Sequence, residues 1–495
     1  MSNVSDASAF QATFATAIVD ALRRRRGPDR RRLAPGPEGL PLLGSTLDVR
    51  ADVLGLFESG RRDYGDTVRF AFGPYDFVLV HRPEDIRTVL LTRAADFHKS
   101  PTYQGLALIL GNGLLTSEGE FWKRQRKLMT PAFHHRQLLG LCETMVRCAS
   151  DQADEWDRAC AGPGPSPAID LHEEMMRLTF RIVGLTLFST ELTGRASDMG
   201  PALSTVLEHA NFIATSLGLA PAPWVPTPRN LRFRRAMKVV DDIVLGIIAR
   251  RRETEGEPGE GPGDLLTMLM SATDESGTER MSDAELRDEV TTLVLAGHET
   301  TAQTLTWTFM LLSRHPEVER RVVAEILEVC GSRTPNMGDL EALTYTGQVI
   351  SESLRLYPPA WLFERQALVD IQLGEFFIPA GTLVAVCPWT LHRHPEHWQN
   401  PEGFDPERFS PENVTERARY TYLPFGGGPR QCIGTNFALY EAKLVMATLL
   451  QRYAVELVPG QDLRPEASVT LRPAAGMRVR LRPRASPRPP SARLP

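Results

Sequence analysis

The spacing of apolar residues divides the chain into a short β-rich part near the N-terminus and a long, mostly helical remainder. Val68, Phe70 and Phe72 alternate with polar or small residues, and a continuous apolar run, Phe77–Val80, follows the turn residues Gly73–Asp76. This arrangement predicts a β-hairpin. Beyond the hairpin, apolar residues recur mostly at helical spacing. The pattern therefore predicts a mainly α fold with a smaller β portion.

The clearest helix is expected from Ser282 to about Arg314. Ser282 and Glu285 form a Ser-x-x-Glu capping box, and an apolar stripe follows on one helical face. The helix ends at His315-Pro316, since the residue before a proline disfavours helical geometry. A helix of more than thirty residues is long enough to cross the whole molecule. We therefore expect it to be central.

Both ends of the chain differ in composition from the middle. Residues 1–32 predict a flexible, Arg-rich tail, and residues 483–495 predict a disordered tail rich in Pro and Arg. The arginine runs 23–26 and 30–32 have two interpretations, a solvated tail or an anchor on anionic lipid. The solvated tail is favoured, because the apolar stretch before the runs is short.

The region between the tails, residues 33–482, is expected to form a single domain. The Gly- and Pro-rich stretch 256–263 inside it predicts a flexible surface connection. It resembles a domain boundary, but residues with candidate chemistry lie on both sides of it. We therefore interpret it as a loop within one domain.

Composition and charge exclude several classes of protein. The chain has 495 residues, 42% of them hydrophobic and 24% charged, which is typical of a globular protein. A net charge of −5 gives no argument for nucleic-acid binding. No apolar run approaches the ~18 residues of a membrane span, and Thr16 and Asp20 interrupt the only candidate signal-peptide core. We therefore expect a cytoplasmic protein without a membrane span.

Cysteine and lysine usage qualify these expectations. The six cysteines contain no Cys-x-x-Cys pair, which argues against a disulfide scaffold or a cysteine zinc site and fits a reducing compartment. Only five of the 56 basic residues are lysines. Because arginine is the default cation here, a lone arginine is weak evidence of function.

The most informative stretch is 425–434, Phe-Gly-Gly-Gly-Pro-Arg-Gln-Cys-Ile-Gly. An apolar helical pattern begins just after Cys432, and a helix start favours thiolate over thiol. The glycines would allow close backbone approach to a flat, bulky group, and Arg430 could meet an anion on that group. These features suit a haem held by sulfur. The alternative, for a lone cysteine, is a small buried hydrophobe.

Five positions match the pattern Phe-x-x-Gly-x-Arg-x-Cys-x-Gly, namely Phe425, Gly428, Arg430, Cys432 and Gly434. The chain therefore resembles the cytochromes P450, the haem-thiolate monooxygenases, over roughly residues 35–480. The resemblance implies the cytochrome P450 fold with its long central helix across the haem. It also implies haem b (iron-protoporphyrin IX) as cofactor, Cys432 as axial iron ligand and O₂ as cosubstrate.

The middle of the predicted long helix reads Ala296-Gly297-His298-Glu299-Thr300-Thr301. Ala296 and Gly297 would leave room for a flat cofactor, and Thr300 can donate to the carbonyl at 296 and open a notch in the helix. Glu299 and Thr300 resemble the family's acid–alcohol pair, which delivers protons during dioxygen cleavage. The alternative is a kinked helix with Glu299 on a solvated face. His298 is interpreted as a core or surface residue, not as a haem ligand.

A second pattern resembles the family's structural triad. Glu352 and Arg355 stand three residues apart on a helix that Tyr357 and two prolines end, and Arg408 follows in a Phe-Asp-Pro-Glu-Arg-Phe segment. The resemblance implies a buried Glu352–Arg355–Arg408 cluster behind the haem. The alternative for the first two is a solvated surface pair.

Haem carries two propionates, so cations should converge from separate segments. Trp122 and Arg126 match the family's Trp-x-x-x-Arg and share one helical face. Arg365, ten residues beyond Arg355, and Arg430 complete the expected set.

Apolar segments in the family's variable regions are expected to face the substrate. They suggest a hydrophobic molecule, such as a terpenoid, steroid, macrolide or lipid, and a role in secondary metabolism. Fatty-acid ω-hydroxylases often carry a haem-linked acid where this chain has Ala296, which argues against that linkage here. The expected residues are Leu106–Leu110, Leu293, Ala296, Ala360–Phe363 and Val469–Leu471.

The expected reaction is insertion of one oxygen atom of O₂ into a hydrophobic substrate. Electrons would come from a separate donor, of the ferredoxin/ferredoxin reductase or flavodoxin type, since the sequence after Cys432 leaves no room for a fused redox domain. One alternative is a peroxide-driven peroxygenase or hydroperoxide isomerase, which typically lacks the acid–alcohol pair. Another is a non-catalytic haem-binding protein. The sequence does not identify the substrate, the site of oxidation or the native donor.

Overall fold

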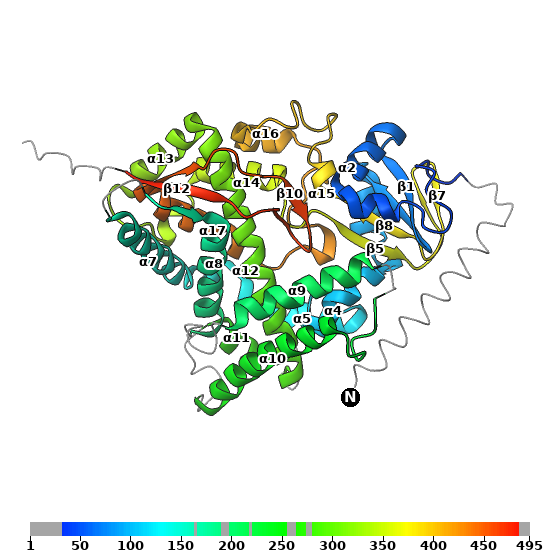
Figure 1. Ribbon diagram of the computed structural model, residues 1–495, viewed down its shortest axis with the longest axis horizontal. Helices are drawn as coiled ribbons and strands as arrows, with labels where there is room; N and C mark the ends of the chain where they lie inside the picture. Colours follow the sequence, from blue (N-terminus) through cyan, green and yellow to red (C-terminus); the bar gives the residue numbers. More distant parts are fainter. Residues whose placement is uncertain are drawn as a thin grey trace, which may run out of the picture.

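The computed structural model describes residues 32–162, 166–189, 198–216, 220–254, 264–273 and 280–484. Figure 1 shows a β-rich end, which contains most of the N-terminal strands, beside a larger helical part. The prediction of a mainly α fold with a smaller β portion is confirmed. The helices are α2 (Thr46–Tyr64), α3 (Pro83–Arg87), α4 (Gln104–Leu110), α5 (Gly119–Met129), α6 (His135–Leu139), α7 (Cys142–Cys160), α8 (Leu171–Phe188), α9 (Met199–Thr215), α10 (Pro228–Thr254), α11 (Leu265–Ser271), α12 (Asp283–Arg314), α13 (Pro316–Cys330), α14 (Thr344–Leu356), α15 (Pro388–Leu391), α16 (Pro411–Glu416) and α17 (Thr435–Arg452).

The strands form one five-stranded sheet and three smaller ones. The large sheet has the order β1-β2-β8-β5-β3, and only its β2–β8 pair is parallel. The strands are β1 (Thr67–Phe72), β2 (Tyr75–Val80), β3 (Phe97–Lys99), β4 (Ala168–Asp170), β5 (Phe363–Ala367), β6 (Ile371–Leu373), β7 (Phe376–Ile378), β8 (Leu383–Val386), β9 (Tyr453–Leu457), β10 (Pro465–Ala467), β11 (Leu471–Pro473) and β12 (Arg478–Pro483).

The predicted hairpin is present as β1 and β2. Its turn is shorter than expected, because Tyr75 already pairs with Phe72, which leaves only Gly73 and Pro74 between the strands. Gly73 has a φ of 56°, in the left-handed region that suits glycine. The hairpin places one face of β1 and β2 against α2, where Phe57 and Phe77 stack at 5.5 Å.

The predicted long helix is α12, a helix of 32 residues from Asp283 to Arg314. Both bonds of the capping box are present, with the Ser282 hydroxyl accepting from the Glu285 amide and the Glu285 carboxylate accepting from the Ser282 amide. Most residues from Thr301 to Leu312 are buried. In Figure 1, α12 runs through the middle of the helical part, with α8 beside it and α14 and α17 behind, so the expectation of a central helix is confirmed.

Both predicted tail boundaries need a small correction. Arg32 is already part of the fold, since its carbonyl accepts the Phe377 amide at 2.8 Å and its side chain pairs with Glu375. Pro483 is the last residue of β12 and pairs with Tyr453, because the strand continues past the expected boundary. Arg484 is also described, and its amide donates to the Arg452 carbonyl at 2.7 Å. Residues 1–31 and 485–495 of the predicted tails and the predicted connection 256–263 lie outside the described residues.

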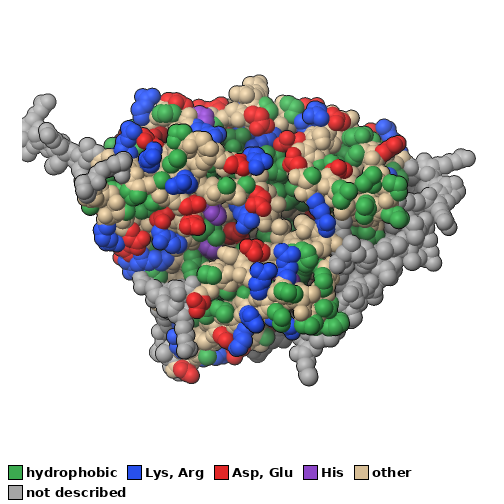
Figure 2. All heavy atoms as spheres, viewed as in Figure 1, with side chains coloured by type: hydrophobic (Ala, Val, Ile, Leu, Met, Phe, Trp, Pro, Cys, Tyr) green, Lys and Arg blue, Asp and Glu red, His purple; other side chains and the backbone are tan. Residues whose placement is uncertain are grey.

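No helix in the described ranges is long and apolar enough to cross a membrane. On the face shown in Figure 2, basic and acidic side chains are interspersed, and hydrophobic side chains gather over the β-rich end. All six cysteines are free thiols.

Candidate active site

A cavity of about 620 Å³ lies between α12 and the loop before α17. Segments from α2, the β1–β2 hairpin, α4, α9 and the β10–β11 turn complete its walls. All eleven residues predicted to act in catalysis or cofactor binding line this one cavity. They are Trp122, Arg126, Ala296, Gly297, Glu299, Thr300, Arg365, Phe425, Arg430, Cys432 and Gly434.

Cys432 lies three residues before the first residue of α17, and its side chain opens onto the cavity. Its amide donates to the Phe425 carbonyl at 2.9 Å, which closes the loop 425–432 on itself. The helix start acts in the expected direction, since the Gly434 amide and the Thr435 hydroxyl lower the pKa of the Cys432 thiol. Burial raises the pKa of the Cys432 thiol, and this outweighs the opposing effects of the Gly434 amide, the Thr435 hydroxyl and Arg126.

The three glycines of this loop serve the loop backbone. Gly426 and Gly428 have φ values of 68° and 66°, which residues with a side chain rarely adopt. A Cβ at Gly428 would also lie 1.9 Å from the carbonyl oxygen of Leu90, in the π-helical turn η1 (Thr88–Thr92). At Gly428 the close approach is therefore made to η1, a protein segment that the sequence pattern does not reveal, whereas Gly426 and Gly427 line the cavity.

Arg430 lies at one edge of the cavity between α5 and the segment before it. Its guanidinium donates to the Ser117 carbonyl at 2.8 Å and pairs with the Glu118 carboxylate. It also stacks over the Trp122 ring, 3.9 Å from the centroid. Burial and nearby Arg365 lower the pKa of Arg430 to about 10. The surrounding protein therefore compensates the positive charge of Arg430 only in part.

Lys99 and Arg365 reach the same edge from adjacent strands. They are direct partners in the β3–β5 register, and Lys99 lies over the Tyr103 ring at 4.5 Å. Burial, Arg365 and Arg430 all lower the pKa of Lys99 well below its ordinary value. Sequence analysis missed Lys99, although a lysine in so Arg-rich a chain was a detectable sign. The edge therefore gathers three cations, with Glu118 beside Lys99 and Arg430 and with Glu364 beside Arg365.

Arg126 lies beside these cations on α5, one helical turn after Trp122, as the Trp-x-x-x-Arg pattern predicted. Its guanidinium donates to the Gln431 carbonyl at 2.9 Å, next to Cys432 in sequence. Burial lowers the pKa of Arg126, with an opposing effect from Cys432. Arg126 thus connects α5 to the cysteine loop.

Thr300 and Glu299 lie on the opposite wall of the cavity, in α12. The Thr300 hydroxyl donates to the Ala296 carbonyl at 2.6 Å, as predicted. The alternative of a solvated Glu299 is wrong, because the residue is 7% exposed and its carboxylate accepts from the Thr470 hydroxyl at 2.7 Å. Burial raises the pKa of Glu299, against the effects of Thr470 and Arg472. Thr470 was expected to face the substrate, but sequence analysis missed its contact with Glu299, which it reaches from the β10–β11 turn.

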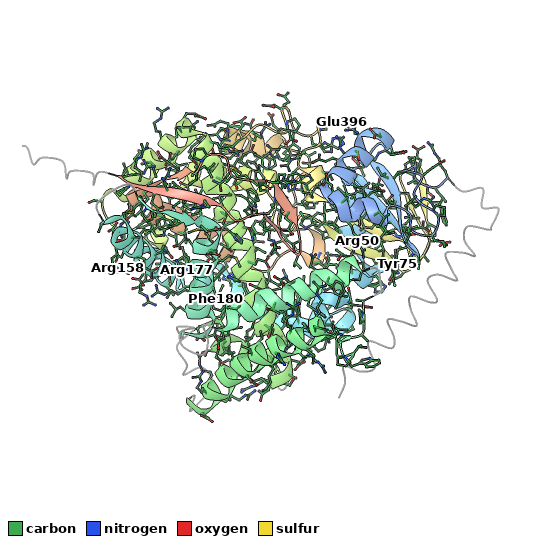
Figure 3. All side chains as sticks on the ribbon, viewed as in Figure 1. Arg50, Tyr75, Arg158, Arg177, Phe180 and Glu396 are labelled. Carbon is green, nitrogen blue, oxygen red and sulfur yellow. The ribbon has the colours of Figure 1, made fainter. Side chains whose placement is uncertain are left out.

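The two small residues before this pair have different surroundings. Ala296 is exposed to the cavity, as expected. A Cβ at Gly297 would lie 3.2 Å from the side chain of Val183, so glycine at this position allows α8 to pack closely on α12. His298 is buried edge-on against the Phe180 ring, 5.2 Å away, which confirms it as a core residue. Figure 3 labels Phe180 on α8.

Glu352, Arg355 and Arg408 form a buried cluster outside the cavity. Arg355 donates two hydrogen bonds to Glu352, at 2.7 and 2.8 Å, and neither side chain is exposed to solvent. Arg408, in the turn η7 (Pro406–Phe409), approaches Glu352 at 3.4 Å. The surface-pair alternative is therefore wrong for Glu352 and Arg355.

The expected substrate-facing segments only partly line the cavity. Leu106, Leu293, Ala296, Ala360–Phe363, Val469 and Thr470 do so. The rest of the Leu106–Leu110 segment and Leu471 do not, because Ile109, Leu110 and Leu471 are core residues. Sequence analysis missed two parts of the cavity wall, namely Tyr75 at the start of β2 and the end of α9. Arg50 closes this region by donating to the Thr215 carbonyl at 3.0 Å, and Figure 3 labels Arg50 and Tyr75 beside it.

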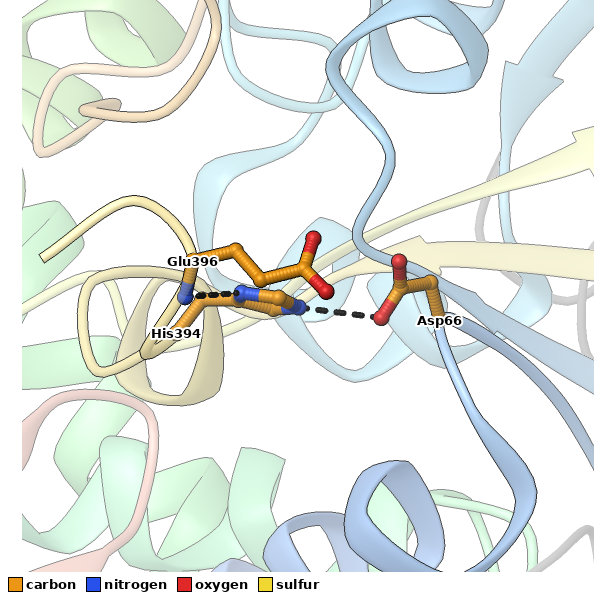
Figure 4. A group of neighbouring side chains, drawn as sticks. All are labelled: Asp66, His394 and Glu396. Carbon is orange, nitrogen blue, oxygen red and sulfur yellow. Dashed lines mark hydrogen bonds and ion pairs between the residues drawn. The ribbon is translucent and has the colours of Figure 1, made fainter.

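Asp66, His394 and Glu396 form a separate cluster outside the cavity (Figure 4). The His394 Nε2 atom lies 2.9 Å from the Asp66 carboxylate, and its Nδ1 atom accepts the Glu396 amide at 3.2 Å. Both ring nitrogens are therefore committed to hydrogen bonds within the protein. The contact between His394 and Asp66 therefore holds the segment after α15 against the residue before β1.

The family model for cytochrome P450 matches residues 34–478. Cyclooctat-9-en-7-ol 5-monooxygenase of Streptomyces melanosporofaciens is 37% identical over 86% of this chain and 90% of that protein. Pentalenene oxygenase of Streptomyces avermitilis is 36% identical over 90% and 96%. The solved structure of retinoic acid bound cyanobacterial CYP120A1 has a TM-score of 0.80 and 27% identity, over 92% and 100%. This chain belongs to the cytochrome P450 family of monooxygenases, which use haem and O₂ and need a redox partner.

Proposed function

We propose that the chain is a haem b monooxygenase in which Cys432 is the axial iron ligand. The single observation that carries this proposal is the composition of the cavity wall. A thiol and the small residue Ala296 both face the cavity, and three partly buried cations gather at one edge. When bound, haem supplies the iron that activates O₂.

The residues present fit such a group. Lys99 and Arg430 share the Glu118 carboxylate, and Arg365 adds a third positive charge beside them, so an added dianion would relieve their mutual repulsion. The two propionates of haem b are such a dianion. An iron cation at the Cys432 sulfur would in turn favour the thiolate, which reverses the effect of burial on the pKa of that thiol.

Glu299 and Thr300 are proposed to handle protons at this site. The Thr300 hydroxyl is held at the cavity wall by the Ala296 carbonyl, and the next residue back is a buried acid. Because burial raises the pKa of Glu299, its carboxyl group can hold a proton and release it through the Thr470 hydroxyl or cavity water. This pair favours O₂-driven chemistry over a peroxide-driven peroxygenase or a hydroperoxide isomerase.

The proposed substrate is an uncharged, hydrophobic molecule, and a terpenoid is the class we favour. Away from the cationic edge, the cavity wall is mostly apolar, with Phe57, Phe72, Leu106, Leu293 and Leu362 among its members. Two similar proteins are named for pentalenene and cyclooctat-9-en-7-ol, which are terpenoid compounds. A steroid, macrolide or other lipid-like molecule would also suit so apolar a wall.

A separate ferredoxin or flavodoxin is proposed as electron donor. Lys123 and Lys127 on α5 and Arg136 on α6 are exposed near Arg126, which contacts the cysteine loop. An acidic donor docked on these residues would lie close to Cys432. A cytoplasmic location remains our prediction.

The described residues are proposed to work as one domain. The cavity is lined by residues on both sides of the 256–263 stretch, from Val49 to Thr215 and from Leu265 to Thr470. Neither side of the stretch could therefore form this cavity alone.

Reconstitution with haem tests the proposed function. Purified protein should bind haem stoichiometrically and show a spectral perturbation when pentalenene or cyclooctat-9-en-7-ol is added. With NADPH, ferredoxin reductase and ferredoxin, it should yield a product with one added oxygen atom, labelled when ¹⁸O₂ is supplied. Label derived from water, or turnover with peroxide but not with O₂, would contradict the proposal.

A further inference from the structure

Helix α12 contains seven threonines, and one of them differs from the rest. Six donate their hydroxyl to the carbonyl four residues earlier, which is the usual arrangement for threonine in a helix. Thr301 does not, although the residue is 2% exposed and lines the cavity. The Thr301 hydroxyl thus makes no hydrogen bond to the Gly297 carbonyl. The six that conform are Thr291, Thr292, Thr300, Thr304, Thr306 and Thr308.

Helix α17 packs against α12, and its residue Glu441, nine residues after Cys432, is the acid whose pKa the Thr301 hydroxyl lowers. Glu441 is completely buried, and neither of its carboxyl oxygens makes a hydrogen bond of ordinary length and angle to a described residue. Its sequence neighbours Ala442 and Leu444 belong to the main hydrophobic core, as does Cys148 of α7, whose pKa Glu441 helps to raise. An acid in these surroundings is an unusual choice for a core position.

The physical state of Glu441 follows from these surroundings. An ionised carboxylate with no cation beside it costs several kcal/mol in a protein core, so the group keeps its proton instead. Burial raises the pKa of Glu441 well above its ordinary value, and only the Thr301 hydroxyl acts in the opposite direction. A protonated carboxyl group is both a donor and an acceptor, and so is a hydroxyl. The two groups are therefore suited to each other as hydrogen-bond partners.

We propose that Glu441 is a positioning residue for the reaction in the cavity, and that it acts through Thr301. As an uncharged acid it engages the Thr301 hydroxyl and keeps that hydroxyl away from the Gly297 carbonyl. The carbonyl oxygen has two lone pairs, and the helix uses one of them. The second stays available to water in the cavity, one residue from the Ala296 carbonyl that Thr300 already occupies.

This arrangement also connects the two helices that carry the chemistry. Glu441 is on the helix that follows Cys432, and Thr301 directly follows Glu299 and Thr300. Their contact fixes the proton-handling segment of α12 relative to the cysteine loop. This inference rests on the proposed function, because it assigns a role in that same cavity.

Three variants of the haem-loaded enzyme test the pair, with one matched control. Thr301→Val removes the hydroxyl at constant volume, and Glu441→Leu removes the acid. Glu441→Gln keeps an uncharged donor and acceptor and should rescue most of what Glu441→Leu loses. Thr306→Val is the control, because Thr306 is a buried threonine of the same helix that bonds only to its own helix.

The main readout is the partition of electrons between product and peroxide. With pentalenene, NADPH and a ferredoxin system, we expect Thr301→Val and Glu441→Leu to lower product per NADPH about three- to tenfold, as loss of one hydrogen bond would. Hydrogen peroxide should rise in step. The double variant should be no worse than either single variant, because both remove the same contact.

Two infrared measurements do not depend on turnover. In haem-free protein at neutral pH, the difference spectrum of wild type minus Glu441→Gln should contain the C=O band of a protonated carboxylic acid, and this band should shift in Thr301→Val. The C–O stretch of carbon monoxide bound to the reduced haem protein should shift in Thr301→Val and Glu441→Leu, but not in Thr306→Val. These bands test the Thr301–Glu441 pair even if pentalenene is not oxidised. Failure of this inference is therefore distinguishable from failure of the proposed function.

Several results would overturn the inference. One is a Glu441→Leu variant with wild-type coupling and an unshifted carbon monoxide band. Another is a Glu441→Gln variant as impaired as Glu441→Leu, which would mean that an exchangeable proton, rather than position, is what Glu441 provides. Equal effects of Thr301→Val and Thr306→Val would mean that Thr301→Val acts only by disturbing the helix in general.

Discussion

Replacing Arg355 with methionine should remove most of the protein's stability. Arg355 is completely buried and donates five hydrogen bonds, two of them to Glu352. The other three reach the carbonyls of His392, Pro401 and Gly403 at 2.6 to 2.8 Å. The side chain thus holds together α14, the segment after α15 and the turn before η7.

The size of the loss follows from these contacts. Removing one partner of a buried ion pair costs about 3–5 kcal/mol, and each buried carbonyl left without a donor adds about 1–3 kcal/mol. Water entry and protonation of Glu352 would recover part of this loss, so a net cost of at least about 5 kcal/mol is expected. Many proteins have a total stability of only about 5–15 kcal/mol. Arg355→Met should therefore yield little folded, haem-binding protein.

The assay is urea-induced unfolding followed by tryptophan fluorescence, with haem content measured in parallel. Trp398 is a built-in reporter, because the Arg355 guanidinium lies 5.2 Å from the centre of its ring. Arg355→Lys keeps the charge but not the planar fork and should be intermediate, which gives a measurable value if Arg355→Met does not fold. Arg480→Met, on an exposed position of β12, is the matched control. A loss below about 1 kcal/mol for Arg355→Lys, together with a folded Arg355→Met, would refute the reasoning.

Four further predictions follow from the site and its surroundings. Thr300→Ala should keep NADPH consumption within about an order of magnitude while product per NADPH falls and peroxide rises, and an unchanged ratio would show that the hydroxyl has no part in proton handling. Arg430→Leu should weaken haem binding in a titration about ten- to a hundredfold, whereas Lys123→Met on exposed α5 should not. Deleting residues 1–31 should leave haem content unchanged, because they lack a core-forming pattern, and marked haem loss would contradict this. His392 accepts the Leu423 amide on one ring nitrogen, and burial lowers the pKa of this histidine to about 3. Because His392 is neutral in the folded protein, the folded protein loses stability as the pH falls below the unfolded pKa of 6.5. In urea titrations between about pH 4 and pH 6, His392→Gln should remove about 1.4 kcal/mol per pH unit of this acid sensitivity, and an unchanged slope would show that His392 is not neutral in the fold.

Sequence patterns predicted the parts of this protein that depend on local chemistry. The capping box at Ser282 and the proline after His315 bound α12, because both act within one or two helical turns. The Thr300 bond to the Ala296 carbonyl is likewise a contact within a single turn. The eleven predicted site residues meet at one cavity because the family motifs that mark them imply a common fold.

What could not be predicted depends on contacts between distant segments. Thr470 reaches Glu299 across 171 positions, and no local pattern marks it as the partner of that acid. Gly428 needs its conformation because of Leu90, which only the folded chain brings near. The pKa of the Cys432 thiol likewise depends on surroundings that no local pattern marks. A helix start can be recognised in a sequence, but the burial that outweighs it cannot.

The most direct test of the central claim is the absorption spectrum of the reduced, haem-loaded protein with carbon monoxide. A thiolate opposite the carbon monoxide should give a strongly red-shifted Soret band, and Cys432→His should abolish the shift while some haem remains bound. The other five cysteines are matched controls, and Cys387→Ser should keep the band because that thiol is buried away from the cavity. A red-shifted band that persists in Cys432→His, or an ordinary haem band in the wild-type protein, would contradict the assignment of Cys432 as the iron ligand.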